Sequence, residues 1–262
     1  MQKLKIIDYD YIFVTGTIGA GKTSLIDKLA SLYQDQAYII KEYIDYDEDG
    51  NNKLNDFLDG KYPAYDFQKY IVDCYMKQFI EADKFFFDKK GQKIIICERH
   101  PLESLLFASF KLDQHQMGYL HDYIKDCCEK LRIPLPIECY QIIFRGEATG
   151  SAVNTDESLT KVANKIKVRK CDNKNMFVHL DVDDKQQLSR LMKRGRESDL
   201  KYLNEPRMEY LNRVNIHYKN LAIANYDIKL SNLYIFYKYD IDEEYEYVEE
   251  TPVKVKAKPF KK

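Results

Sequence analysis

A glycine-rich segment near the start of the chain restricts the folds that it can adopt. Residues 16–24 read Gly-Thr-Ile-Gly-Ala-Gly-Lys-Thr-Ser and match the pattern G-x-x-x-x-G-K-[ST]. Residues 11–15 before it are mostly β-branched or aromatic, as in a buried strand, and apolar residues recur after it at helical spacing. A strand, a glycine loop and a helix in this order form a phosphate-binding loop, in which backbone N–H groups and the helix dipole attract phosphate. We therefore expect the chain to bind a nucleoside triphosphate, rather than to form a glycine turn without a ligand.

The pattern also gives roles to individual residues of this loop. Lys22 is expected to reach the β- and γ-phosphates, and the Thr23 hydroxyl to hold Mg²⁺. Glycines allow the backbone to wrap closely around the phosphates. The residues of the loop that we expect to bind the donor nucleotide are Gly16, Thr17, Ile18, Gly19, Ala20, Gly21, Lys22, Thr23 and Ser24.

The composition narrows the class of protein. The 262 residues include 41 Lys and Arg and 42 Asp and Glu, which gives a net charge of −1. A dedicated nucleic-acid binder normally has a basic surplus, so we expect no nucleic-acid partner. No apolar run approaches about 18 residues and the N-terminus lacks a secretory signal, so we expect no membrane association and a cytoplasmic location. Six cysteines without C-x-x-C spacing are typical of free thiols in a reducing compartment.

Strand and helix patterns alternate along the chain. Strands are predicted at 11–15, 37–43, 93–97, 139–144, 176–182 and 233–238. Helices are predicted directly after the glycine loop, at 65–87, 102–110, 116–131 and 184–194, and from about residue 206. Residues 45–64 are polar, with two glycines and a proline, and predict a loop with at most one helical turn. This alternation predicts an α/β fold, an open parallel sheet with helices on both faces.

We expect a single domain over residues 1–239. Within it, residues 146–175 are polar without a sustained period and predict a mobile insertion. Residues 240–262 are acidic and then basic, and predict a disordered tail. The pattern leaves open whether 139–144 or 176–182 forms the more central strand.

Charged residues stand at the ends of two of the predicted strands. The second strand ends at Glu42, and the third ends at Glu98 and Arg99. In open α/β sheets, ligands bind beyond the carboxyl ends of the strands, where the glycine loop also lies. A carboxylate there could accept a proton from a hydroxyl nucleophile or hold Mg²⁺, and an arginine could neutralise charge on a transferring phosphoryl group.

A second group of cations lies toward the C-terminal part of the chain. Arg190 and Arg194 share a helix face, and Arg196 follows Gly195. Like charges at this spacing repel each other, so an anion that visits the cluster would explain it. The glycine and the polar residues 197–199 predict a mobile flap.

Five segments in this order resemble those of the deoxynucleoside kinases, which include herpesvirus-type thymidine kinases and cellular deoxycytidine and deoxyguanosine kinases. Glu42 lies 20 residues after Lys22, where that family has its general base. The other segments are Phe67-Gln68-Lys69-Tyr70, Glu98-Arg99-His100-Pro101, Arg194-Gly195-Arg196, and the pairs Tyr210-Leu211 and His217-Tyr218. The resemblance runs from about residue 11 to about 222 and implies a P-loop kinase fold with a mobile arginine lid.

The resemblance implies a role for each of these groups. Glu42 takes the proton from the 5′-hydroxyl of a deoxynucleoside, Arg99 orients the 5′-oxygen and the phosphoryl group, and Glu98 holds Mg²⁺ with Thr23. The resemblance also implies that Arg190, Arg194 and Arg196 close over the phosphates of ATP. The implied catalytic residues are Glu42, Arg99, Lys22, Arg194 and Arg196, and the implied nucleoside contacts are Gln68, Ile71, Tyr75, Arg99, Ser104 and Asp199.

The resemblance also bears on the substrate. Gln68 is expected to read the nucleobase, because its amide offers both an acceptor and donors in one plane. Ile71, Tyr75 and Ser104 carry no charge, which favours thymidine or broad pyrimidine use. The chain departs from the family pattern after Glu42, where Tyr43 and Ile44 replace the usual Pro-Val. A homodimer formed through helices is implied as well.

Two other functions remain open. A nucleoside monophosphate kinase of the thymidylate kinase type shares the loop and the lid, but it needs a cationic site for the substrate phosphate. The second alternative is a nucleotide-binding switch that does not catalyse a reaction. The sequence contains no guanine-reading motif N-K-x-D for such a switch, since Asn173-Lys174-Asn175-Met176 does not fit it.

Overall fold

The computed structural model describes residues 10–136, 140–145, 175–182, 184–204 and 207–223. The predicted insertion at 146–174, the strand at 233–238 and the tail at 240–262 lie outside these residues. No helix in the part of the chain that is described is both long and apolar enough to cross a membrane.

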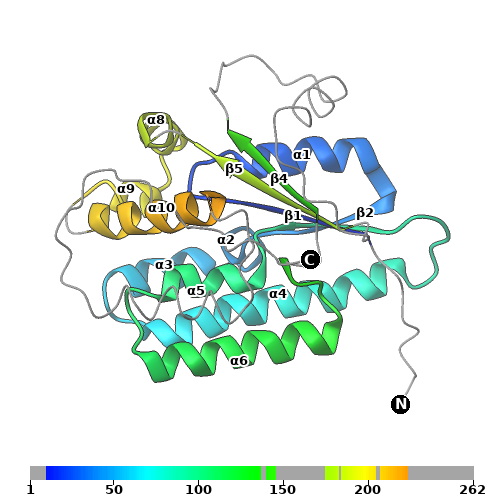
Figure 1. The fold of residues 1–262 in the computed structure, drawn as a ribbon, viewed down its shortest axis with the longest axis horizontal. Helices are drawn as coiled ribbons and strands as arrows, with labels where there is room; N and C mark the ends of the chain where they lie inside the picture. The colour runs from blue at the N-terminus through cyan, green and yellow to red at the C-terminus, as the bar shows by residue number, and fades with distance from the viewer. Residues whose placement is uncertain (1–9, 137–139, 146–174, 183, 205–206, 224–262) are drawn as a thin grey trace, which may run out of the picture.

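Five parallel strands form one sheet in the described residues (Figure 1). They are β1 (Asp10–Gly16), β2 (Ala37–Ile40), β3 (Ile94–Glu98), β4 (Tyr140–Arg145) and β5 (Met176–Asp181), in the spatial order β2-β3-β1-β5-β4. The order answers the question that the sequence left open, since β5 pairs with β1 and β4 lies at the edge. The prediction that the second strand reaches residue 43 is wrong, because β2 ends at Ile40.

The predicted helices begin close to their expected positions, and the structure adds three short ones, α2, α3 and α9, in its described part. The described helices are α1 (Lys22–Tyr33), α2 (Tyr43–Tyr46), α3 (Gly50–Leu58), α4 (Ala64–Phe86), α5 (Ser104–Ala108), α6 (Gln114–Leu131), α8 (Asp184–Arg194), α9 (Glu197–Lys201) and α10 (Arg207–Ile223), with 3-10 turns at Gln34–Gln36 and Pro101–Glu103. The prediction of a loop over 45–64 is wrong, because α3 fills much of it. Leu54 and Phe57 are the buried apolar residues of α3, three positions apart, and Phe57 stacks on Phe67 at 4.5 Å between ring centroids. The apolar side chains of α3 are Leu54, Phe57 and Leu58, and so short a set was outweighed by the polar residues and the turn formers Gly50, Gly60 and Pro63 around it.

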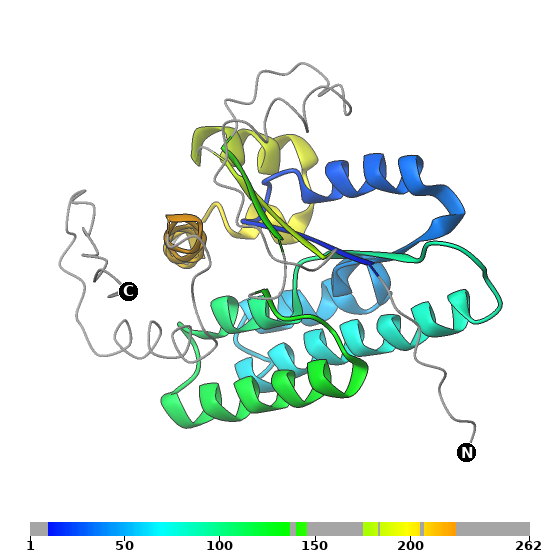
Figure 2. The ribbon, with the colours of Figure 1, turned by 45° about the vertical axis from the view of Figure 1, so that its right-hand side comes forward.

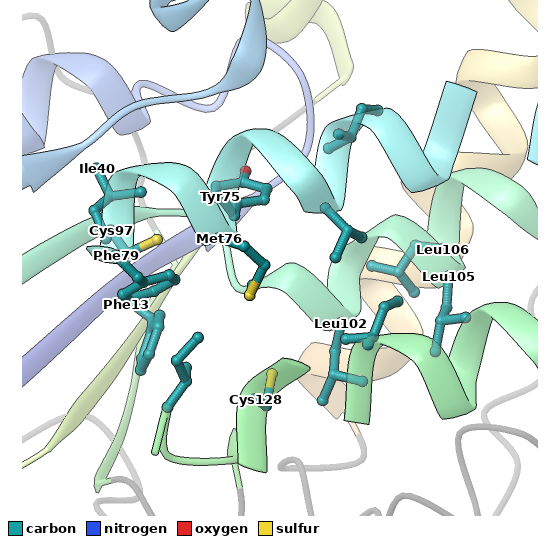
Figure 3. Close-up of a cluster of buried hydrophobic side chains, with 14 of the residues drawn as sticks. Phe13, Ile40, Tyr75, Met76, Phe79, Cys97, Leu102, Leu105, Leu106 and Cys128 are labelled. Atoms are coloured by element: carbon teal, nitrogen blue, oxygen red, sulfur yellow. The ribbon is translucent and has the colours of Figure 1, made fainter. Parts of the chain in front are cut away.

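The two faces of the sheet are covered by different helices (Figures 1 and 2). On β1, Ile12 and Val14 pack into a core on the side of α1, whereas Tyr11 and Phe13 pack on the side of α4, α5 and α6. Figure 3 shows part of this second, larger core, where Phe13 meets side chains of α4. The alternation along β1 is that of a strand buried on both faces, and it confirms the predicted α/β fold with helices on both sides.

All five strands point the same way, so their carboxyl ends share one edge of the sheet. The glycine loop follows β1, Glu42 follows β2, and Glu98 is the last residue of β3. The helix α8, which carries Arg190 and Arg194, follows β5. The fold therefore brings the predicted site residues to one edge from four distant parts of the sequence.

Gly16 is the residue at which β1 turns into the loop, and no side chain fits there. Its φ is +138°, and a Cβ at this position would lie 2.4 Å from the carbonyl oxygen of Leu180 on β5. Gly91 also has a positive φ, +97°, but nothing lies within 4 Å of the corresponding Cβ position.

We therefore predict that Gly16→Ala lowers the free energy of unfolding by about 3 kcal/mol, because backbone strain adds to the clash with β5. Gly91→Ala, the matched control, costs about 1 kcal/mol from strain alone. Urea unfolding monitored by circular dichroism measures both values. Equal losses in the two variants would contradict the close approach of Gly16 to β5.

Candidate active site

The glycine loop has the geometry of a phosphate-binding loop. It connects the end of β1 at Gly16 to the start of α1 at Lys22, and Gly19 and Gly21 adopt positive φ angles of +79° and +98°. Gly21 is the N-cap of α1, so the loop ends at the positive end of this helix. The buried Lys22 extends back along the loop, with Nζ 3.2 Å from the carbonyl oxygen of Thr17. The predicted strand, loop and helix are all in place.

Helix α8 holds the carbonyl groups of this loop. Arg190 Nη1 donates to the carbonyl oxygens of Gly19, at 3.2 Å, and Ala20, at 2.9 Å. Gln187 Nε2 donates to the carbonyl oxygen of Ile18 at 2.7 Å. These bonds fix the loop carbonyls against α8. Arg190 thus contacts the loop itself, whereas the sequence predicted contact with the phosphates of ATP.

A buried polar network extends these contacts to α10. Thr17 Oγ1 donates to Asn215 Oδ1, and the side chains of Gln187 and Asn215 bond to each other, with Asn215 Nδ2 2.5 Å from Gln187 Oε1. Gln187 and Asn215 were not predicted from the sequence. Amphipathic helices carry many polar side chains, and the sequence pattern does not distinguish a buried one from the rest.

Glu42 lies between two cations at the carboxyl edge of the sheet. It accepts a hydrogen bond from Arg99 Nε, and its Oε1 is 3.8 Å from Lys22 Nζ. Burial alone would raise the pKa of this carboxyl, but the charges of Arg99 and Lys22 outweigh it and hold the pKa well below its usual value. Glu42 is therefore ionised at neutral pH.

Glu98 lies in a different electrostatic environment, at the end of the neighbouring strand β3. Burial, followed by the charge of Glu42, raises the pKa of Glu98 above its usual value. Its Oε1 accepts a hydrogen bond from Thr23 Oγ1 at 3.0 Å. These two hard oxygen donors at the end of the phosphate-binding loop suit Mg²⁺, which is usually held by one or two protein oxygens together with phosphates and water. A divalent cation would also add to the positive charge of Lys22 and Arg99, which does not by itself offset burial and the charge of Glu42 at Glu98.

Arg99 connects the parts of this site. Its Nη1 donates to the carbonyl oxygen of Gly16 at 2.7 Å and to Glu103 Oε2 at 3.4 Å, and it also bonds the Tyr218 hydroxyl. Its backbone has a φ of +69°, which is unusual for a residue with a side chain. Its backbone N–H donates to the carbonyl oxygen of Val14 at 2.9 Å. The bonds around it hold this strained backbone in place.

Glu103 and Tyr218 are further members of the site that the sequence did not assign. Tyr218 on α10 donates to Glu103 Oε2 at 2.5 Å, and both contact Arg99. Glu103 Oε1 also accepts the backbone N–H of His100 at 2.7 Å, which makes it part of a capping box. Its spacing from His100, three residues on, is the signal that could have revealed it.

The arginine segment, residues 190–199, folds back against the site. After α8, Gly195 has a φ of +65° and turns the chain into α9. Arg194 Nε is 2.6 Å from Asp199 Oδ2, and Arg196 Nη2 is 3.0 Å from Asp45 Oδ1. Arg194 is also close enough to Glu42 to lower the pKa of its carboxyl. The structure thus brings Arg194 toward the predicted base and pairs Arg196 with α2.

Gln68 has an unsatisfied polar atom in the interior. The side chain is 1% exposed, and its Oε1 has no hydrogen-bond partner in the described part of the chain. Ile71 and Tyr75 follow it on the same face of α4. Ser104 is also buried and begins α5, which packs against α4. Tyr75 is turned toward the sheet, because its hydroxyl donates to the carbonyl oxygen of Glu98 at 2.8 Å.

His100 has a structural role. Its Nδ1 accepts the N–H of Leu102 at 3.1 Å, and its Nε2 lies 3.0 Å from the carbonyl oxygen of Pro134. Both contacts are satisfied by the neutral ring with the proton on Nε2, and burial lowers the pKa of His100 to about 4.

Because His100 takes up a proton more readily in the unfolded chain than in the folded one, acid favours unfolding. We predict that stability is complete above pH 6.5 and falls as the pH drops toward 4. In His100→Gln, the slope of the free energy of unfolding against pH becomes shallower by about one proton, or about 1.4 kcal/mol per pH unit. The exposed His115→Gln is the control, and an unchanged slope in His100→Gln would contradict the buried neutral ring.

Comparisons with known proteins find one family and two solved structures that this chain resembles. The family model described as deoxynucleoside kinase matches residues 12–131. A solved structure of deoxyadenosine kinase from M. mycoides with bound dATP is similar at 19% identity, with a TM-score of 0.50, over 88% of this chain and 100% of that chain. A second structure of deoxyadenosine kinase from M. mycoides, with products dCMP and a flexible dCDP bound, has 18% identity and a TM-score of 0.48, over 88% of this chain and 98% of that chain. None of the curated protein sequences matches this one significantly.

Proposed function

We propose that this chain, which belongs to the deoxynucleoside kinase family through residues 12–131, transfers the γ-phosphoryl group of ATP to the 5′-hydroxyl of a deoxynucleoside. One observation carries the proposal: Glu42, Arg99 and Lys22 meet in ion-pair contact directly beside the phosphate-binding loop. A carboxylate in this position serves an acceptor hydroxyl, whereas a protein that only bound a nucleotide would have no use for it.

Glu42 is the proposed base. The 5′-oxygen forms its bond to the γ-phosphorus while the bond from that phosphorus to the β-phosphate oxygen breaks, and the hydroxyl proton passes to Glu42. The low pKa of Glu42 makes it a weak base. A weak base suffices because the transition state of phosphoryl transfer is loose and most of the catalysis is positioning and charge stabilisation.

Arg99 and Lys22 supply positive charge on either side of Glu42. Lys22 would hold the β- and γ-phosphates, and Arg99 would orient the 5′-oxygen. Thr23 and Glu98 are the residues that would hold Mg²⁺, which neutralises charge on the donor phosphates when it is bound. Arg194 and Arg196 are proposed to leave Asp199 and Asp45 for the phosphates when ATP binds, which would release Asp199 for the sugar 3′-hydroxyl.

Gln68 is the proposed contact of the nucleobase. A buried carbonyl oxygen without a partner is costly, and a ligand N–H would satisfy it. Ile71, Tyr75 and Ser104 near it are uncharged, and for that reason we propose thymidine or another pyrimidine deoxynucleoside as the acceptor. The similar M. mycoides structures are named deoxyadenosine kinase, so deoxyadenosine is the purine deoxynucleoside to compare with the pyrimidines in an activity assay.

A coupled assay of ADP release tests the function directly. It uses ATP, Mg²⁺ and a panel of deoxynucleosides and deoxynucleoside monophosphates, with the product identified by mass spectrometry. We expect a 5′-monophosphate from deoxynucleosides and the highest kcat/KM for pyrimidines. Turnover of monophosphates alone would show a monophosphate kinase instead, and ATP binding without turnover would favour a nucleotide switch. Light scattering on the same sample tests the proposed homodimer.

We predict that Glu42→Gln lowers kcat by about 10²–10⁴-fold, since the amide cannot accept the hydroxyl proton. ATP binding, measured by calorimetry, should persist, because Lys22 and the loop are unchanged. Glu48→Gln, an exposed position in the same region, is the matched control and should keep full activity. An unchanged kcat in Glu42→Gln would remove Glu42 from this role.

We also predict that Gln68→Ala raises the KM for the deoxynucleoside by about 10-fold and reduces discrimination among bases, because a hydrogen-bonded base loses its partner. The KM for ATP should stay the same. Lys77→Ala, exposed on the same helix, is the control. If relative kcat/KM values across the bases do not change, Gln68 does not read the base.

A further inference from the structure

The hydrogen-bonded pairing between β2 and β3 ends at Ile40, so that only Lys41 separates it from Glu42. Ile40 pairs with Cys97 as the last register of the two strands, and Figure 3 shows both beside α4. The next residue, Lys41, has left the sheet. Its backbone groups nevertheless have partners, because Lys41 N–H donates to Gln78 Oε1 at 2.8 Å and Lys41 C=O accepts from Gln78 Nε2 at 2.9 Å.

Gln78 thus takes the place of a neighbouring strand. Its planar amide offers one acceptor and one donor on the same side, the arrangement that a peptide group needs. The side chain is 2% exposed, and Nε2 also lies 3.4 Å from the carbonyl oxygen of Cys74 on its own helix. The amide is therefore held on α4 and, in turn, holds the backbone of Lys41.

Helix α4 also donates a hydrogen bond to the end of β3. Tyr75, one turn before Gln78, donates its hydroxyl to the carbonyl oxygen of Glu98 at 2.8 Å. Helix α4 therefore places two polar groups at the ends of β2 and β3. These contacts fix the backbone of Lys41, which precedes Glu42, and of Glu98, which carries the second carboxylate.

The backbone of Glu42 is then fixed from both sides. Gln78 holds the residue before it, and α2 begins after it, with the N–H groups of Asp45 and Tyr46 bonded to the Glu42 carbonyl oxygen at 3.0 and 3.1 Å. Glu42 makes its ion pairs with Arg99 and Lys22 from this position. We propose that Gln78 is a positioning residue for the base, which aims the Glu42 carboxylate at the reacting hydroxyl through the backbone of Lys41. This inference rests on the proposed function.

Gln78→Met tests the inference, because it keeps the length of the side chain and removes both hydrogen bonds. We expect kcat to fall by about 10- to 100-fold, since a shift of about 1 Å in a catalytic group has an effect of this size. The KM for ATP should change by less than about twofold, because the loop and Lys22 do not contact Gln78. Gln78→Ala is the second variant, in which water can enter to satisfy Lys41, so the fold is retained if Gln78→Met proves unstable.

A double-mutant cycle separates positioning from general loosening of the structure. If Gln78 acts through Glu42, Gln78→Met lowers kcat strongly in the wild-type background and by less than about twofold in the Glu42→Gln background. A purely structural effect would lower kcat equally in both. Lys77→Ala is the control on the same helix, because Lys77 is exposed and its removal leaves both Lys41 and α2 untouched.

Each outcome decides between the possibilities. A full kcat in folded Gln78→Met, an equal loss in both backgrounds, or an equal loss in Lys77→Ala would overturn the role of Gln78 while leaving the kinase activity in place. Absence of deoxynucleoside phosphorylation by the wild-type protein, or an unchanged kcat in Glu42→Gln, would instead refute the proposed function and this inference with it.

Discussion

The guanidinium group of Arg99 is the interaction on which the rest of the site depends. It contacts Glu42 on one side and Glu103 and Tyr218 on the other, and it donates to Gly16 at the entrance of the phosphate-binding loop. Only a planar group with several fixed donors serves all these partners at once. Arg99 thereby links the sheet edge, the loop and α10, and it holds the ionised, partly exposed Glu42 at this edge.

The two carboxyl groups at this edge, those of Glu42 and Glu98, have pKa values shifted in opposite directions. Glu42 lies against two cations, and its pKa is lowered, whereas Glu98 is buried beside Glu42, and its pKa is raised. Such separation of two neighbouring carboxyl groups is typical of sites in which each has its own role. The first suits a hydroxyl acceptor and the second, with Thr23, suits a cation. This separation supports the proposed pair of substrates, a nucleotide on the loop and an acceptor beside α4.

The fold and the centre of the site were predictable because they depend on local patterns. The strands of the described sheet, the loop at 16–24, and the positions of Glu42 just after β2 and of Glu98 at the end of β3 follow from apolar runs and motif spacing. The helix at Gly50–Leu58 did not, because its three apolar residues, Leu54, Phe57 and Leu58, lie among polar residues and turn formers. Gln78 and Gln187 were missed for a different reason. Each bonds to backbone or side-chain groups of another element, and such contacts leave no periodic signal in one sequence. Glu103 was missed although its spacing from His100 is that of a capping box.

The most direct test of the account is the binding of both substrates to Arg99→Lys. Lysine keeps the charge but cannot bond Glu42, Gly16 and Glu103 together. Calorimetry with ATP and with a deoxynucleoside, on protein whose fold is checked by circular dichroism, measures both halves of the site. If Arg99 joins the two halves, both affinities fall, by about 10-fold or more. A folded variant in which only one affinity falls, or neither does, would contradict the account.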